Sequence, residues 1–334
     1  MSQWRPNHPA PGIAYVGPKV CAECHDDVYS RQTVTVMNRA LQSAEDSPVL
    51  KSHPSLNFRL GPYTYRISRV GQRSVYSVTD GKDTLSEPVL WSFGQGRAGQ
   101  TYVFEHKGNY YESHVSFFND SQSLDNTIGH PRTIPESLEE AAGRPIGSAE
   151  IRSCIGCHST GAVSGKELHI EKMIPGVSCE ACHGPGGKHV SAMKEGSLKE
   201  SYILNPGRLS ADRLSQEFCG ACHRSVDDVM LLPNPGQISN VRMQPYRLFN
   251  SSCYSDDRRI ACTACHASTP VPPGQARHSD KNSRDSSKKM APSCPAGTRQ
   301  CVGCHMPKVE LPGAHFKFTD HWIRIVRAGD PYPV

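Results

Sequence analysis

The chain has 334 residues and a formal net charge of +5, from 37 Lys and Arg against 32 Asp and Glu. A charged fraction of 21% is too low for a charge-driven disordered chain, and no run of 18 apolar residues predicts a transmembrane helix. The 28 glycines and 26 prolines follow no period, which excludes collagen-like and coiled-coil chains. The length indicates two domains or one large domain.

Six similar cysteine motifs are spread unevenly along the chain. Twelve of the 14 cysteines form pairs with two residues between them, and a histidine follows each pair at once. C-x-x-C-H is the attachment site of c-type haem, in which both thiols bond to the haem vinyl groups and the histidine ligates the iron. Zinc sites and redox dithiols do not require that histidine, and six such placements by chance have a probability on the order of 10⁻⁸. We therefore predict six covalently bound haems c.

These motifs define the predicted haem-anchoring residues. The cysteines are Cys21, Cys24, Cys154, Cys157, Cys179, Cys182, Cys219, Cys222, Cys262, Cys265, Cys301 and Cys304. The proximal iron ligands are His25, His158, His183, His223, His266 and His305. Two cysteines stand outside the motifs, Cys253 and Cys294. Because haem is attached outside the cytoplasm, where disulfides persist, we expect a bridge between these two, with two free thiols as the alternative.

Residues 1–54 are predicted to form an N-terminal arm with the first motif, and residues 55–125 a small antiparallel β subdomain without haem. Tyr63, Tyr65 and Ile67 alternate with polar residues, which is the pattern of a half-buried strand. Val70-Gly71-Gln72-Arg73 predicts a turn before a strand at 75–78. Residues 101–105 and 110–118 predict a second hairpin around residues 107–109.

A glycine-rich stretch, Gly94-Gln95-Gly96-Arg97-Ala98-Gly99, matches the dinucleotide-binding fingerprint G-x-G-x-x-G. A dinucleotide site needs a helix directly after the glycines. The residues that follow, QTYVF at 100–104, favour a strand instead. We interpret the stretch as a connection between strands and expect no NAD or flavin.

Residues 126–334 carry the other five motifs, between residues 154 and 305. Only short helical patterns occur there, such as 137–142 and 211–218, and Pro and Gly interrupt them. The prediction is a multihaem cytochrome fold of short helices and coil wrapped around packed haems, whose macrocycles supply apolar area. Residues 267–300 are polar, basic and Pro-rich, which is typical of a solvent-exposed loop.

Several segments resemble the multihaem c-type cytochromes of the superfamily that includes the tetrahaem electron acceptor of hydroxylamine oxidoreductase. They extend from about residue 15 to residue 327 and include Tyr15-Val16-Gly17, GVSCEACHGPGGKHV (176–190), NPGRL (205–209), FCGACHR (218–224), PYRLFNSSC (245–253), CVGCHMPK and HFKFTDHWIRI. The stretch FGQGRAGQTYVFEHKGNYYESHVSFF resembles the haem-free insertion of a hexahaem-type branch.

The resemblance also implies distal iron ligands. It points to His130, His189, His315 and His321, with His53 as a weaker candidate. Relatives often place Met or His a short helix after the first motif, where this chain has Met37. If the thioether of Met37 binds the iron, we expect the first haem to have the highest reduction potential. If nothing binds there, the first haem is the candidate open site. We expect His106, His114 and His169 to be surface residues.

The motifs favour electron transfer, as a carrier or wire, over catalysis. Six haems on so short a chain must lie close together, and closed haems move electrons without bond chemistry. One alternative is a reductase or oxidase of a nitrogen or sulfur oxyanion with one open haem, as in some relatives of the wider superfamily. Another is a subunit of a polymeric cytochrome filament or a membrane-associated respiratory complex, as in anaerobic respiration.

Haem attachment implies export, so we expect a periplasmic or extracellular location. Met1-Ser2-Gln3-Trp4-Arg5 lacks the apolar segment of a signal peptide, so we expect a leader on the natural precursor or a misassigned start. The expected partners are redox proteins, with possible homo-polymer or membrane-complex association. The charge of +5 omits the haem propionates, so it does not predict a nucleic-acid partner.

Overall fold

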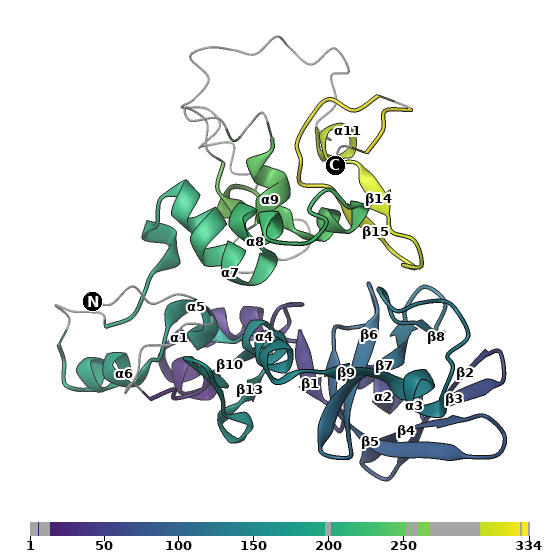
Figure 1. Cartoon of the computed structure of the whole chain (residues 1–334). Coiled ribbons are helices and arrows are strands. Elements are labelled where there is room, and N and C mark those ends of the chain that lie inside the picture. The colour runs from purple at the N-terminus through teal and green to yellow at the C-terminus, as the bar shows by residue number, and fades with distance from the viewer. Residues whose placement is uncertain are drawn as a thin grey trace. The chain divides into compact units, whose positions relative to one another are not determined.

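The computed structural model describes residue 6 and residues 14–197, 202–251, 254, 260–266, 301–327 and 329–332. The chain divides into two compact units (Figure 1). The first, here the helical unit, comprises Met1–Gln32, Cys182–Leu311 and Lys317–Val334. The second, the β unit, comprises Thr33–Ala181 and Pro312–Phe316. The expected loop at 267–300 and the expected bridge between Cys253 and Cys294 lie outside the described residues.

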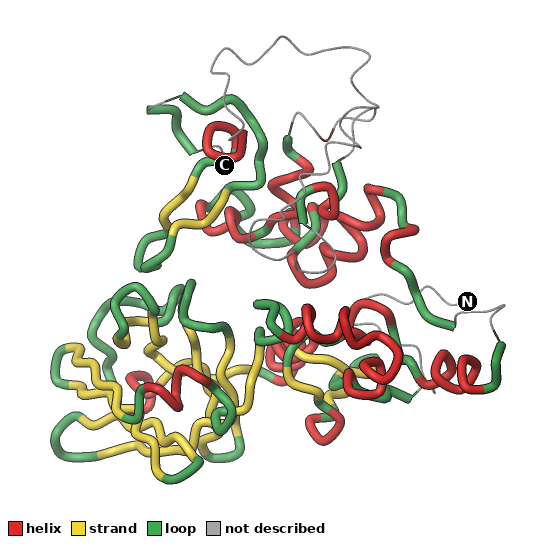
Figure 2. Tube along the Cα trace, turned by 180° about the vertical axis from the view of Figure 1, so that it is seen from behind, coloured by secondary structure: helices red, strands yellow, loops and turns green. Residues whose placement is uncertain are grey.

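An antiparallel sheet dominates the β unit. Its path runs β2 (Ser55–Leu60), β3 (Tyr63–Val70), β4 (Arg73–Thr79), β5 (Thr84–Phe93), β6 (Gln100–His106), β7 (Asn109–Phe118) and β8 (Ser123–Asn126), each strand pairing with the next. β1 (Leu41–Ser43) pairs with β5, and β9 (Gly143–Ile146) pairs with β7. Strands β2 and β8 also lie in contact, so the sheet curls on itself (Figure 2). The sheet extends on both sides of the predicted range 55–125.

The sequence pattern of the first hairpin is confirmed in the sheet. Tyr63, Tyr65 and Ile67 are all buried on β3, and the strand turns at Gly71 into β4. These side chains join a core that the curled sheet encloses. Its aromatic members from the later strands are Tyr76, Tyr102, Phe104, Tyr111 and Phe117. Their burial supplies most of the apolar area that this unit removes from water.

The glycine-rich stretch is a connection between strands, as predicted. It joins β5 to β6, which pair antiparallel. Gly94 and Gly96 have φ of +82° and +78°, a region that favours glycine. A Cβ on Gly96 would lie 2.5 Å from Oδ1 of Asn119, so the close approach of these two segments also requires glycine.

Short helices and ribbons complete the β unit. α2 (Pro48–Ser52) and α3 (Leu138–Ala142) are each capped by a serine, Ser47 and Ser137, which confirms the helical pattern at 137–142. α4 (Ser148–His158) leads into β10 (Ser159–Thr160), which pairs with β13 (Ile174–Pro175). β11 (Val163–Ser164) pairs with β12 (Glu167–Leu168), and η1 (Ile170–Lys172) follows.

The helical unit consists of short helices. They are α1 (Pro18–Thr33), α5 (Cys179–His183), α6 (Gly187–Lys194), η2 (Pro206–Arg208), η3 (Arg213–Cys219), α7 (Gly220–His223), α8 (Val226–Met230), η4 (Ile238–Arg242), α9 (Gln244–Phe249), η6 (Cys262–Ala264) and α11 (Cys301–His305). β14 (Lys308–Glu310) and β15 (Lys317–Thr319) form a hairpin. The predicted helix at 211–218 is largely the π-helical turn η3. Among the described residues, no helix is both long and apolar enough to cross a membrane.

Candidate haem sites

Five of the six motifs lie within helical segments of the described chain. α1 carries the first, α4 the second, α5 the third, η3 with α7 the fourth and α11 the sixth. In the fifth motif η6 holds Cys262, and Cys265 and His266 follow its end. Residues three and four positions apart lie on one face of an α-helix. In α4 and α5 the two cysteines and the histidine therefore share one face, as a porphyrin held by two thioethers and one imidazole nitrogen would require. In α1 the backbone departs from helical angles at His25.

The described cysteines fit covalent attachment. Each of the ten cysteines of the first five motifs is at least partly exposed. Thiols that reach the surface of the protein can bond to vinyl groups. The residues present therefore match the chemistry of haem c at these five motifs.

Hydrogen bonds orient four of the motif histidines through Nδ1. His158 donates to the carbonyl oxygen of Ala40 at 3.2 Å, His183 to that of Leu204 at 2.8 Å and His305 to that of Arg324 at 3.0 Å. His223 donates to Oε1 of Gln244 at 3.2 Å. A carbonyl can only accept, so the proton is on Nδ1 and the lone pair is on Nε2. That tautomer is the one an axial iron ligand needs.

Two candidate distal histidines face a motif histidine within the helical unit. The ring centroids of His25 and His189 are 6.5 Å apart, with an interplanar angle of 15°. Those of His266 and His321 are 6.1 Å apart, at 21°. These separations lie in the upper part of the usual range for ring pairs. Two imidazoles that bound one metal through bonds of about 2 Å would have centroids about 6 Å apart, so both pairs are compatible with shared ligation.

Three other candidate distal histidines lie in the β unit, and each has Nε2 against a side-chain oxygen. His130 is 3.1 Å from Oε2 of Glu112, and His315 is 2.7 Å from Oδ2 of Asp125. His53 is 3.2 Å from Oε1 of Gln122. None of these rings is paired with a motif histidine among the described ring contacts. Their assignment as ligands stays a prediction.

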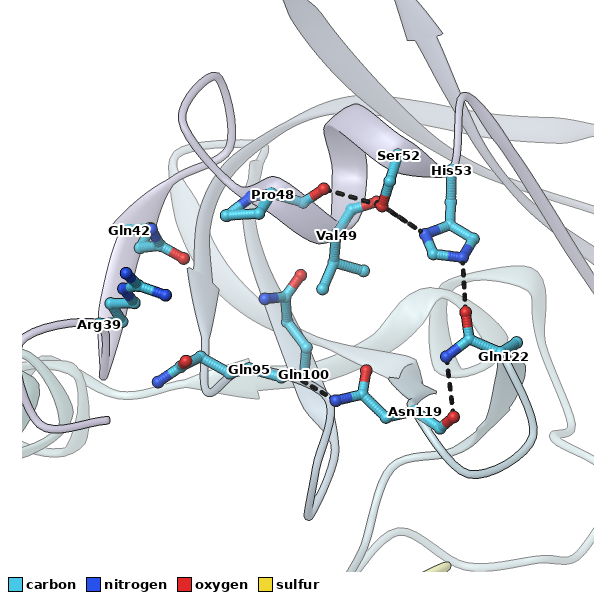
Figure 3. Close-up of a pocket in the computed structure, with 10 residues that line it drawn as sticks. All are labelled: Arg39, Gln42, Pro48, Val49, Ser52, His53, Gln95, Gln100, Asn119 and Gln122. Carbon is cyan, nitrogen blue, oxygen red and sulfur yellow. Dashed lines mark hydrogen bonds between the residues drawn. The ribbon is translucent and has the colours of Figure 1, made fainter. Parts of the chain in front are cut away.

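His53 lies at the edge of a polar pocket of about 450 Å³, with Arg39, Gln42, Gln95, Gln100 and Asn119 among its lining residues (Figure 3). Its Nδ1 is 2.9 Å from Oγ of Ser52 and 3.0 Å from the carbonyl oxygen of Val49. Both ring nitrogens are therefore engaged by the pocket wall. No motif residue lines this pocket.

Met37 lies in a turn just before β1. Its side chain is 43% exposed, and its carbonyl oxygen accepts hydrogen bonds from the backbone N–H groups of Ala40 and Val177 at 3.1 and 3.0 Å. The backbone at Met37 is thus held in place. Its role as an iron ligand stays a prediction.

One histidine that we expected at the surface is buried. His114 on β7 is 4% exposed, and its buried Nε2 has no hydrogen-bond partner. Burial, together with the nearby charge of His130, lowers the pKa of His114 to about 4, so the imidazole is neutral at physiological pH. His114 lies where the pairing of β6 and β7 shifts register, and residues 113–118 are buried on both faces of the strand, so no local pattern predicted this burial.

Motif thiols converge in the helical unit. The thiols of Cys219 in the fourth motif and Cys262 in the fifth lie close enough to shift each other's pKa. The thiol of Cys262 also donates to Oγ of Ser215 at 3.5 Å. Cys182 of the third motif is near enough to act on Cys219 electrostatically. Three consecutive motifs therefore bring anchoring sulfur atoms into one region.

Known proteins share parts of this sequence. A family model described as cytochrome c554 and c-prime matches residues 111–184. The high-molecular-weight cytochrome c of Nitratidesulfovibrio vulgaris is 25% identical over 190 residues, which cover 54% of this chain and 29% of that protein. Cytochrome c-554 of Nitrosomonas europaea is 35% identical over 81 residues, 22% of this chain and 34% of that protein. The solved structure of outer cell wall cytochrome OcwA gives a TM-score of 0.38 at 21% identity, covering 63% of this chain and 37% of that one.

The chain thus spans about a third of the length of the curated relatives that it matches. Both relatives and the family model are c-type cytochromes, and the chain repeats the C-x-x-C-H attachment site. These likenesses and the six C-x-x-C-H motifs support a multihaem c-type cytochrome that binds haem c covalently.

Proposed function

We propose that this cytochrome holds six haems c and conducts electrons between redox partner proteins outside the cytoplasm. When bound, haem supplies a one-electron Fe(III)/Fe(II) couple. The observation that supports the count is the sixfold repetition of C-x-x-C-H, with each motif in a helical segment or beginning in one. The proposed periplasmic or extracellular location rests on covalent haem attachment, which implies export.

Two of the sites have bis-histidine ligation in this proposal. His25 and His189 hold the first iron, and His266 and His321 hold the fifth. The near-parallel rings at 6.5 and 6.1 Å support these pairs, because two imidazoles bound to one metal would have a similar separation. On this assignment Met37 is not the sixth ligand of the first iron.

The proposed route of electrons includes the fourth and fifth sites in sequence. Cys219 and Cys262, which would each hold one of these cofactors, lie close together, and Cys182 of the third motif lies nearby. Short separations favour fast transfer and leave the protein to adjust potentials through ligands, burial and charge.

The ligand assignment is tested with His189→Ala and Met37→Ala in the fully haem-loaded protein. Intact mass should first show six covalent haems in the parent and in both variants. Electron paramagnetic resonance of the oxidised protein should then show one new high-spin haem in His189→Ala and no change in Met37→Ala. The reverse result would make Met37 the ligand. A high-spin haem in the parent protein would instead favour a catalytic role at an open iron.

A further inference from the structure

The helical unit contains a buried ion pair between α9 and the segment after β15. The side chains of Arg247 and Asp320 are both 0% exposed. Nε of Arg247 donates to Oδ1 of Asp320 at 2.9 Å, and Nη2 donates to Oδ2 at 3.0 Å. This bidentate geometry is the strongest form of an arginine–carboxylate pair. Arg324 also donates to Asp320, from Nη1. We call the three residues Arg247, Asp320 and Arg324 the arginine cluster.

Aromatic and amide groups surround the guanidinium. Its central carbon lies 4.7 Å from the ring centroid of Trp322 and 4.5 Å from that of Tyr332. Nη1 donates to Oδ1 of Asn240 at 3.2 Å, and the same oxygen accepts from the Tyr332 hydroxyl at 2.8 Å. Burying an ion pair costs about as much desolvation energy as its attraction returns, so stability alone does not explain such a site.

The arginine cluster fixes the backbone on both sides of His321. Asp320 accepts from the backbone N–H of Trp322 at 3.0 Å and from Nη1 of Arg324 at 2.6 Å. Ser251 adds two bonds to the same segment, donating to the carbonyl of His321 at 2.9 Å and accepting from Ile323 N–H at 2.7 Å. The imidazole itself donates from Nδ1 to the carbonyl of Thr319 at 3.0 Å. These bonds fix the backbone before and after His321 and orient its ring, which faces His266.

The same arginine cluster reaches the sixth motif. The carbonyl oxygen of Arg324 accepts from Nδ1 of His305 at 3.0 Å, and the backbone N–H of Arg324 donates to the carbonyl of His305 at 3.1 Å. Arg324 thus connects the buried Asp320 directly to the proximal histidine of the sixth site.

We propose that the arginine cluster positions His321 at the fifth haem and His305 at the sixth, and that its individual charges shift the reduction potentials of both. This inference rests on the proposed ligation of the fifth iron by His266 and His321. The cluster places two guanidinium groups and one carboxylate beside the segment that carries His321. A buried positive charge is weakly screened and favours Fe(II), the less positive state of the iron, and a buried negative charge favours Fe(III). Arg247 and Asp320 are positioning residues here, because they act through His321.

The test compares charge-changing variants of the haem-loaded protein by spectropotentiometry. His321→Ala first identifies the fifth haem as the one that becomes high-spin. Asp320→Asn removes the negative charge and should raise the midpoint potential of that haem. Arg247→Met removes a positive charge and should lower it. Arg247→Lys keeps the positive charge but loses the bidentate hydrogen bonds to Asp320. It should therefore change the low-spin resonance of that haem more than its potential.

A matched control uses the exposed pair of Lys317 and Glu310 on the β14–β15 hairpin, whose ions lie 3.7 Å apart. Lys317→Gln should leave the potentials unchanged, because water screens that charge. If the midpoint potential shifts in the same direction in Asp320→Asn and Arg247→Met, or in neither, the inference is overturned. A general loss of structure would not give shifts of opposite sign in the two variants. If His321→Ala leaves every haem low-spin, the proposed ligation fails instead.

Discussion

At the scale of single residues, the histidines differ in the partners of their ring nitrogens. In four motifs Nδ1 of the histidine donates to an oxygen atom, which leaves Nε2 available to bind iron. Resemblance named His189 and His321 as ligands, but the sequence could not tell which motif each one serves. Ring geometry pairs them with His25 and His266. His114 was assigned to the surface, and it is buried because its strand faces the core.

Gly176, just before the third motif, offers a prediction about backbone conformation. Its φ is +78°, and a Cβ would overlap the carbonyl oxygen of Asn38. We expect Gly176→Ala to cost about 3 kcal/mol or more of unfolding free energy, because backbone atoms must move. Gly165 has φ of +60° with open space around it, so Gly165→Ala should cost only about 1 kcal/mol. Urea unfolding of both variants measures the difference, and equal midpoints would contradict the expected overlap.

At the scale of elements, the hairpins of the β unit were predictable because the alternation at 63–67 and the turn residues at 107–109 are local patterns. Strands β1 and β9 lay outside the predicted range, because each is short and pairs with β5 or β7 far along the chain. The glycine-rich connection is held by a buried network. Ser47 donates to Oε1 of Gln100 at 3.0 Å, and Nε2 of Gln100 donates to the carbonyl of Gly94 at 2.8 Å.

This network predicts unequal effects for two helix caps. Ser47 is buried and caps α2 while holding Gln100, whereas Ser137 is exposed and caps α3 alone. Ser137→Ala should cost about 1 kcal/mol, the usual effect of losing a cap. Ser47→Ala should cost about 2–3 kcal/mol, because it also leaves a buried amide oxygen unpaired. Thermal unfolding followed by circular dichroism compares them. Similar losses would show that the buried bond contributes little.

At the scale of the whole molecule, the cofactors change the net charge. The polypeptide alone has +5 and an isoelectric point near 8.5. With six haems and ionised propionates, the total becomes about −1 when oxidised and about −7 when reduced. Isoelectric focusing of the haem-loaded protein should therefore give a point well below 8.5, and lower still after reduction. A basic point in both states would count against six haems with ionised propionates.

The sequence by itself predicts where cofactors attach and by what chemistry, because C-x-x-C-H is a local motif. It also predicted the strand at 63–70 through alternation and the strand at 109–118 through the turn at 107–109. Only the tertiary structure decided which distant histidine faces which motif, that Cys219 and Cys262 lie close together, and that Arg247 reaches Asp320. Those contacts join residues far apart in the chain, so no local pattern encodes them.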